Sequence, residues 1–314
     1  MTSIRSFRIA FVAAFTLAAV VAAVAQRGPV PDPVVREGVT TKVAGHTWVI
    51  PDDNVPLVPN VGIVVGSAAT LVIDPGLGRA NGEAVLREVA KVSRNEQLFI
   101  GTTHFHPEHT TGYLAFPASA RYVNSTAQEA EWVESGTQMV QAFSKRSPAT
   151  AALLADAVRR PADITFERDH IIDLGGVTVH VLLVGPTHTR GDTVFFVEQD
   201  RVLFAGDVVM NQSFLAAGAA ASMRGWLAAF DAFDAWKPTV VVPAHGAVGT
   251  GALIGENRAF MSEIQSRAQA LAAEGRSADE AAKIVTAELT AKHPGWPRAN
   301  GIANATRAAF AEVR

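Results

Sequence analysis

Short apolar runs alternate with longer amphipathic stretches along most of the chain, and this pattern predicts an α/β fold. The segments with strand character are Thr47–Ile50, Val61–Val65, Thr70–Ile73, Gln97–Gly101, Ala120–Asn124, Ile164–Phe166, His170–Leu174, Val177–Val184, Thr193–Glu198, Arg201–Ala205 and Thr239–Val242. Within Val177–Leu183 every second residue is Val or Leu, which gives the strand one apolar face. The pairs Gly175-Gly176 and Gln199-Asp200 separate neighbouring runs and predict hairpin turns.

The longer stretches carry apolar residues at helical spacing. We predict helices over Gly82–Val92, Ala127–Phe143, Ala149–Arg159, Ser222–Trp236, Leu253–Glu274 and Ala278–Lys292, and in a last segment from Ala303. In the Ser222–Trp236 segment, one stripe holds Trp226, Ala229, Phe230 and Phe233. Such a stripe indicates a core-facing side of the helix and not a platform for a ligand.

The N-terminal residues have the plan of a secretory signal peptide. Arg5 and Arg8 precede the apolar run Ile9–Ala25, which ends in the small residues Ala23-Val24-Ala25. We expect residues 1–25 to be cleaved and the mature protein to be periplasmic or secreted, with no stable insertion in the membrane. The alternative is an uncleaved membrane anchor, because the run is near the lower length limit for spanning a bilayer.

Charge and cysteine content narrow the possible functions. Removal of residues 1–25 takes away two arginines and no acidic residue, so the formal net charge changes from −3 to −5. A chain of this charge offers no basic surface for a phosphate backbone, so we expect a small-molecule substrate and no nucleic-acid partner. The absence of cysteine excludes disulfides, thiolate metal ligands and thiol catalysis.

The rest of the chain divides by its composition. Residues 26–43 contain proline and arginine without periodicity, and we expect a flexible arm there. Residues 44–250 hold the predicted strands and form the main domain. Residues 251–314 are helical, and we interpret them as an extension packed on the same domain, with an oligomer contact or a wall of the substrate cleft as the alternative. We expect the cleft to be walled by the loops Asp52–Asn60 and Asn211–Met223.

Several predicted strands end in residues that can bind a metal ion. These residues are Asp74, His104, His106, Glu108, His109, His188, Asp207 and His245. In open α/β sheets, ligands and catalytic groups collect at the carboxyl ends of the strands. We therefore predict that these segments, which are far apart in sequence, converge on one metal centre.

The spacing within the histidine cluster supports this prediction. His104 and His106 lie two residues apart in an extended segment and project to the same side, so both can reach one ion. Pro107 suits the first turn of a helix and places Glu108 and His109 on a new axis, toward a second ion. Imidazole and carboxylate donors without thiolate favour Zn²⁺, and Fe or Mn less strongly.

At these positions the chain resembles the metallo-β-lactamase-fold hydrolase superfamily. The family signature of His-x-His-x-Asp-His, a later His, a Gly-Asp pair and a final His is matched, within about residues 44–250, by His104, His106, Glu108, His109, His188, Asp207 and His245. The resemblance implies a four-layer αββα sandwich, with which the predicted strands and helices are compatible. It also implies a first ion on His104, His106 and His188, a second on His109, His245 and position 108, and Asp207 as the bridge.

Position 108 departs from the family, because it carries Glu where Asp is usual. The added methylene moves the carboxylate outward by about 1.5 Å. Glu108 either ligates a second ion after its loop adjusts or lies outside the ligands and acts as a base, so we expect two zinc ions, with one ion as the alternative. Asp74, at a strand end, is expected to orient a ligating imidazole, and its alternative role is capping of the turn at Pro75-Gly76.

The resemblance implies a metal-bound hydroxide that attacks an ester, lactone or amide, with Glu108 and Asp207 as catalytic candidates. A β-lactam is one alternative substrate, although the all-histidine lactamase group lacks an aspartate ligand such as Asp207. The phrases Met223–Leu227 and Val242–Gly246 are similar to other exported members, associated with quinoprotein and sulfur-oxidation operons. Further alternatives are a mononuclear iron centre that oxidises persulfides and a non-catalytic metal-binding protein.

Overall fold

The structure is a computed structural model that describes residues 31–218 and 220–313. The chain divides into two units, Met1–Pro31 and Asp32–Arg314, and the fold described below is that of the second unit. The signal peptide predicted in residues 1–25 lies outside the described residues. None of the described helices is both long and apolar enough to cross a lipid bilayer.

The first sheet has seven strands that are neighbours in their sequence order. They are β1 (Thr41–Lys42), β2 (Thr47–Ile50), β3 (Val61–Val65), β4 (Ala69–Ile73), β5 (Gln97–Gly101), β6 (Arg121–Ser125) and β7 (Ile164–Phe166). Strands β1 to β4 pair antiparallel, whereas β4 to β7 pair parallel. The carboxyl ends of β4, β5 and β6 therefore meet at one edge of the sheet.

The second sheet has six strands in the order β13-β12-β11-β10-β9-β8. They are β8 (Asp169–Asp173), β9 (Thr178–Leu183), β10 (Thr193–Val197), β11 (Val202–Gly206), β12 (Val240–Pro243) and β13 (Gly249–Thr250). Strands β11 and β12 form the parallel pair, and their register shifts between Phe204 and Gly206. A shift of this kind bends a strand and re-aims the side chain that follows it, which here is Asp207.

Alternation along the strands places apolar residues on both faces of each sheet. Leu71 and Ile73 of β4 join Phe195 of β10 in the core between the two sheets. Val72 of the same strand faces outward and packs with Val85 of α1 (Gly78–Val92). Gly101 at the end of β5 lies so close to Phe195 that an added Cβ would come within 2.5 Å of its ring.

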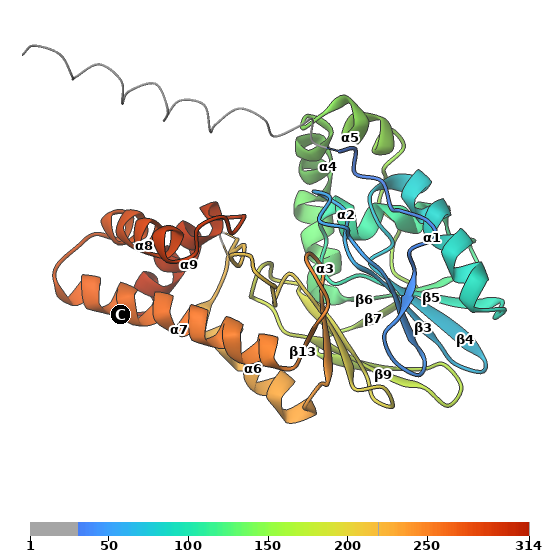
Figure 1. Ribbon diagram of the computed structural model, residues 1–314. Coiled ribbons are helices and arrows are strands. Elements are labelled where there is room, and N and C mark those ends of the chain that lie inside the picture. The colour runs from blue at the N-terminus through green and yellow to red at the C-terminus, as the bar shows by residue number, and fades with distance from the viewer. Residues whose placement is uncertain (1–30, 219, 314) are drawn as a thin grey trace, which may run out of the picture. The chain divides into compact units, whose positions relative to one another are not determined.

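The outer face of the second sheet packs on helices. Leu203 of β11 lies in one core with Trp226 and Phe230 of α6 (Met223–Trp236), the residues predicted to face the core. Helix–sheet–sheet–helix layering is the four-layer αββα sandwich that was predicted (Figure 1). The remaining helical segments before α6 are α2 (Pro107–Thr110), η2 (Thr111–Ala115), α3 (Thr126–Glu131), the π-helical turn η3 (Trp132–Gly136), α4 (Thr137–Ser144) and α5 (Pro148–Leu153).

Residues 32–43 differ from the flexible arm predicted over residues 26–43, because they are packed on α1. The backbone N–H of Val35 donates to Asn81 Oδ1 at 2.7 Å, and the Val35 side chain is buried. Glu88, 1% exposed, accepts from the Gly38 N–H at 2.8 Å and from the Thr40 hydroxyl. Asn81 and Glu88 of α1 thus hold this segment in place. The composition of residues 32–43 alone could not predict these contacts.

The predicted helix Ala149–Arg159 also differs, since α5 ends at Leu153. The backbone groups that would continue the helix are bonded elsewhere: Tyr113 Oη donates to the Val158 carbonyl at 2.8 Å and accepts from the Arg160 N–H at 3.1 Å. A buried tyrosine from another part of the chain therefore outweighs the local preference for helix.

The C-terminal extension belongs to the core on the outer face of the second sheet. It contains α7 (Ala252–Ala273), α8 (Ala278–Lys292) and α9 (Asn300–Ala311). Ile264 of α7 is fully buried in the same apolar cluster as Trp226. Ile302 of α9 lies in that cluster as well, so these helices and the sheet share one continuous core.

A shared core predicts that damage to α7 destabilises the whole domain. We expect Ile264→Ala to lower the free energy of unfolding by roughly 2–5 kcal/mol, because it leaves a cavity in that core. Gln269→Ala, at an exposed position of the same helix, should change it by less than about 0.5 kcal/mol. Urea unfolding followed by far-UV circular dichroism measures both, and a separate transition for the C-terminal helices would contradict the shared core.

Candidate metal centre

Three imidazoles from two distant segments meet with their ring nitrogens facing one another. His104 and His106 follow β5, and His188 lies between β9 and β10. His106 Nδ1 lies 3.0 Å from His104 Nε2 and 3.3 Å from His188 Nε2. His104 and His188 are buried and His106 is partly buried. The structure brings together the three residues predicted for the first ion.

A second group lies next to the first and contains Glu108, His109 and His245. His109 Nε2 lies 4.0 Å from Glu108 Oε1. Pro107 starts α2, as predicted, and this short helix directs Glu108 and His109 toward the cluster. These are the residues predicted for the second ion.

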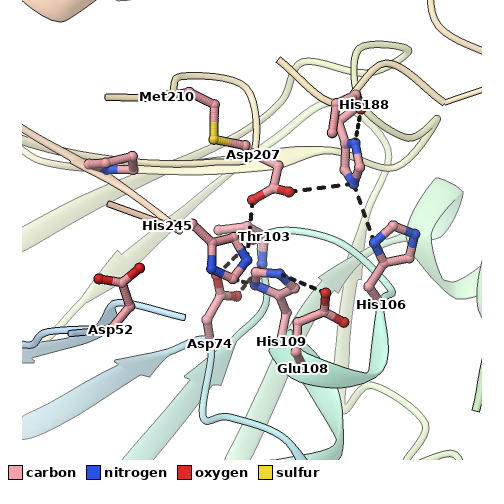
Figure 2. A network of polar contacts seen from close by, with 12 residues as sticks. Asp52, Asp74, Thr103, His106, Glu108, His109, His188, Asp207, Met210 and His245 are labelled. Carbon is pink, nitrogen blue, oxygen red and sulfur yellow. Dashed lines mark hydrogen bonds and ion pairs between the residues drawn. The ribbon is translucent and has the colours of Figure 1, made fainter. Parts of the chain in front are cut away.

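Asp207 lies between the two groups, as Figure 2 shows. Its Oδ2 is 3.7 Å from His188 Nε2, and its Oδ1 is 3.8 Å from His245 Nε2. Asp207 directly follows Gly206, whose φ is 57° and whose added Cβ would come within 2.7 Å of Thr103 Cβ. Only glycine is suited to that conformation and that close approach, and it turns the chain so that Asp207 enters the site.

The imidazoles are fixed by hydrogen bonds from their outer nitrogens. His109 Nδ1 lies 3.0 Å from Asp74 Oδ2, and His245 Nδ1 lies 2.9 Å from the Val58 carbonyl oxygen. His188 Nδ1 donates to the Ala216 carbonyl. Each of these bonds places a proton on Nδ1, so that in the neutral imidazole Nε2 has the lone pair and points into the site.

Asp74 has the place that was predicted for it, beside a ligating imidazole. Besides its contact with His109, it accepts from the Thr103 N–H and the Thr103 hydroxyl, both at 2.7 Å. Its backbone has a φ of 55°, a conformation that is uncommon for residues other than glycine. The strained turn after β4 thus aims one carboxylate at both the loop that carries His104 and the ring of His109.

The loop that carries His188 is folded around another buried carboxylate. Asp192 accepts from the Thr189 N–H at 2.8 Å, from the Thr189 hydroxyl at 2.6 Å and from the Thr187 hydroxyl. Arg190 of this loop points away from the site and pairs with Glu131 and Glu134. The arginine therefore has a surface role and does not face the substrate cleft.

Burial and neighbouring charges prepare the site for a cation. Burial, followed by repulsion from the other imidazoles, lowers the pKa of His104 and of His106 well below the usual value. Burial also lowers the pKa of His245 to about 3. Although burial opposes ionisation of Asp207, Arg298 and the imidazoles hold its pKa below the usual range. Neutral imidazoles around an ionised carboxylate are the state that a divalent ion binds.

His109 and Glu108 differ from the other ligands in their electrostatics. Burial opposes protonation of His109, but the adjacent Asp74 carboxylate raises the pKa of His109 to about 9. A carboxylate partner of this kind makes a ligating imidazole a stronger donor to a metal. Burial raises the pKa of Glu108, so this carboxyl is stabilised as an anion only by a positive charge beside it.

The donor set and its spacing fit divalent metal ions. Four nitrogen ligands at the Zn–N distance of 2.0–2.1 Å in a tetrahedron lie about 3.3 Å from one another, and the first group matches this spacing. Among the described residues, Glu108 Oε2 and His109 Nε2 of the second group, and Oδ1 of the adjacent Asp207, are buried without a hydrogen-bond partner. Buried polar atoms normally have partners, and an ion would supply one to all three. Glu108 thus lies among the candidate ligands of the second group.

A cavity of about 800 Å³ opens onto both groups. Its walls include the two loops that were predicted, through Asn54, Val55 and Leu57 on one side and Asn211 and Ser213 on the other. Two further walls complete the cavity. Met139, Phe143 and Arg146, in and after α4, form one that was not predicted from the sequence. Pro297, Arg298 and Asn300, before and at the start of α9, form the other, which corresponds to the cleft-wall alternative given for the extension.

Arg298 is the missed residue that lies nearest the ligands. Its Nη1 donates to Asp207 Oδ2 at 3.0 Å. It comes from a stretch of the C-terminal extension that has no motif, ninety-one positions from Asp207 in the chain. The cleft-wall alternative considered for the extension was the only sequence-based pointer to such a residue.

Comparisons with known proteins agree with the fold and the ligand pattern. The profile of the Metallo-beta-lactamase superfamily matches residues 54–245, which includes every residue of the two metal-binding groups. A search of curated protein sequences gave no match.

Several solved structures have a similar fold. A metallo-beta-lactamase from Pontibacter korlensis is 22% identical, covers 70% of this chain and 97% of its own, and has a TM-score of 0.54. A metallo-beta-lactamase family protein from Thermus thermophilus is 19% identical, with coverages of 84% and 91% and a TM-score of 0.59. A stereoselective inverting sec-alkylsulfatase from Pseudomonas sp. is 14% identical, with coverages of 87% and 50% and a TM-score of 0.64. At these identities the likeness shows the fold alone.

The contacts of Asp74 predict a specific defect in metal binding. We expect Asp74→Asn to weaken the second of two bound zinc ions by about 10–100-fold, because the His109 ring loses its charged partner. The first ion should keep an affinity closer to that of the wild type. Competition titration with a chromophoric chelator measures both affinities. Asp231→Asn, at an exposed ion pair on α6, is the matched control, and equal affinities in the two variants would contradict the role of Asp74.

Proposed function

The chain belongs to the metallo-β-lactamase superfamily, and from this premise we propose that it is an exported metal-dependent hydrolase of an ester, lactone or amide. Members of this superfamily are mostly metal-dependent hydrolases, and the fold family commonly binds zinc. Export is proposed from the charge and apolar pattern of residues 1–25.

One observation carries the proposal: two imidazole nitrogens lie 3.0 and 3.3 Å from the Nδ1 atom of His106, and Asp207 lies between this cluster and a second group of candidate ligands. Structural histidines do not gather in this way, because their lone pairs repel one another without a cation. Two adjoining ligand groups on the floor of an open cavity favour a catalytic centre over a closed structural site.

When bound here, divalent ions would lower the pKa of a coordinated water and polarise a substrate carbonyl. The protein groups supply the geometry for this chemistry. Asp74, the Val58 carbonyl and the Ala216 carbonyl hold three imidazoles in fixed orientations, so the ligands need little rearrangement. No serine or cysteine nucleophile is required at such a centre.

The position of Glu108 supports a role as a ligand of the second ion. Its Oε1 lies 4.0 Å from His109 Nε2, and its Oε2 is buried without a hydrogen-bond partner within the part of the chain that is described. Glu108 also lines the cavity, where a base could act, but its approach to His109 supports the ligand role. We therefore favour two zinc ions per chain over a mononuclear iron centre.

A β-lactam substrate is a second candidate with a specific observation in its favour. The metallo-beta-lactamase from Pontibacter korlensis is matched over 97% of its length. Against this candidate, about a third of the present chain has no counterpart there, and Arg298 in the C-terminal extension lies at the cavity.

We predict that the zinc-loaded protein contains two zinc ions per chain and hydrolyses at least one member of a panel of esters, lactones, amides and a chromogenic cephalosporin. Elemental analysis and a spectrophotometric screen measure the two properties. His106→Ala should reduce hydrolysis to background, because it removes a ligand of the first ion. His180→Ala should keep full activity, since that imidazole pairs with Glu198 away from the site.

The same measurements separate the alternatives. One iron per chain together with oxidation of a persulfide would show a dioxygenase and not a hydrolase. Two zinc ions with no turnover of any compound would support a non-catalytic metal-binding protein. Unchanged hydrolysis in His106→Ala would remove the proposed centre from the reaction.

A further inference from the structure

The cavity above the ligands is lined by two arginines, each from a connection between two helices. Arg298 lies between α8 and α9, and Arg146 lies between α4 and α5. Apolar side chains, among them Leu57, Met139 and Phe143, form much of the remaining wall. An apolar cleft with guanidinium groups at two of its walls is suited to a ligand that is part apolar and part anionic.

Arg298 has donors to spare. Nη1 bonds Asp207 Oδ2 at 3.0 Å and lies 3.9 Å from Met210 Sδ. In the described residues, Nε and Nη2 have no partner, and the side chain is 28% exposed. A guanidinium carries five N–H donors in a planar fork, so most of this fork remains available to an oxyanion that enters the cavity.

The backbone of Arg298 is held in an unusual conformation. Its φ is 69°, a region that non-glycine residues seldom adopt. Neighbouring contacts fix it there: the Phe214 N–H donates to the Pro297 carbonyl at 3.1 Å, and the Gly301 N–H donates to the Arg298 carbonyl at 2.9 Å. Strain that the surrounding structure maintains is typical of functional positions.

Arg146 is held differently, on another part of the wall. Its guanidinium lies 3.7 Å from the centre of the Phe143 ring, and Phe143 in turn packs near His106. Among the ion pairs of the described residues there is none that involves Arg146. Its charge acts on Glu108 and His106 through space, without a direct contact to a carboxylate.

The charges in the cavity favour an anion. The acidic side chains in its wall are Asp52, Glu108 and Asp207, of which two are metal ligands. Asp52 accepts from the Gly246 N–H at 2.8 Å and from the Asn54 N–H at 3.1 Å, so its carboxylate is held in the loop. With two divalent ions bound, positive charge exceeds negative charge, and such a cleft attracts anionic substrates.

We propose that Arg298, with Arg146, makes this an anion-selective site whose substrate joins an apolar portion to a carboxylate or sulfate group. The proposal rests on the proposed function, since it takes the anion to be part of the hydrolysed compound. Arg298 is a specificity-determining residue in this account, and the C-terminal extension supplies it to the active site.

Equilibrium binding tests the proposal without requiring turnover. The probes are octanoate, octyl sulfate and octanamide, titrated by calorimetry into the zinc-loaded protein. We expect the wild type to bind at least one anion about tenfold or more tightly than octanamide, and Arg298→Met to lose about tenfold for that anion with less than twofold change for octanamide. The tighter of the two anions identifies the head group.

Matched variants keep the test decisive. Arg298→Lys should retain part of the preference, because the charge remains although the fork is lost. Arg146→Met should weaken the anions to a smaller extent. Arg121→Met, at an exposed position where β6 begins and therefore at the opposite edge of the sheet from the ligands, should bind as the wild type does.

The outcomes separate this proposal from the hydrolase itself. Equal loss of octanamide and anion binding in Arg298→Met, or no anion preference in the wild type, overturns the proposal. A fall in zinc affinity in Arg298→Met that accounts for the whole loss also overturns it, because the residue would then only position Asp207. Anion preference without hydrolysis of any panel compound supports the anion selectivity of Arg298 but refutes the proposed function, and with it the statement that the anion belongs to a hydrolysed substrate.

Discussion

The site depends on hydrogen bonds that hold mutually repelling imidazoles close together. Imidazole lone pairs at 3.0–3.3 Å and carboxylates buried beside them are unfavourable neighbours unless a cation lies among them. The fold holds them together with hydrogen bonds that act from outside the cluster, at Asp74, Val58 and Ala216. Each bond ties an imidazole to a different loop at this end of the sandwich. The fixed position of these three loops is therefore what makes the ligand geometry possible.

The C-terminal extension contributes to that fixed position as well as to the cavity. Its helices share a core with α6 and the second sheet. Gly301 at the start of α9 lies against the Leu215 carbonyl, and Asn304 Nδ2 donates to the Ala217 carbonyl at 3.0 Å. These contacts hold the segment whose Ala216 carbonyl orients His188. The packed helices of the extension thus contact the same segment that orients His188. The extension is therefore part of the active-site structure.

Much of this arrangement could be predicted from the sequence, because its signals are local. The strands are recognisable because their residues alternate between apolar and polar or are apolar throughout. The candidate ligands directly follow these strands, so His104, His188, Asp207 and His245 could be assigned together. The number of ions stayed open from the sequence, since the reach of Glu108 depends on how α2, which also carries His109, is set against the other ligands. The sequence could not show Arg298 as a cavity residue, because its position results from packing between helices. The same holds for residues 32–43, whose partner Glu88 is recognisable only in the folded chain.

The most direct test of the account is the location of the ions themselves. Anomalous X-ray diffraction at the zinc edge, from crystals of the zinc-loaded protein, measures this without reference to any substrate. We predict two peaks per chain. One should lie about 2.0–2.1 Å from His104 Nε2, His106 Nδ1 and His188 Nε2, and the other should lie among Glu108, His109, His245 and Asp207. No peak at the three-histidine group, or zinc bound only elsewhere on the protein, would contradict the account.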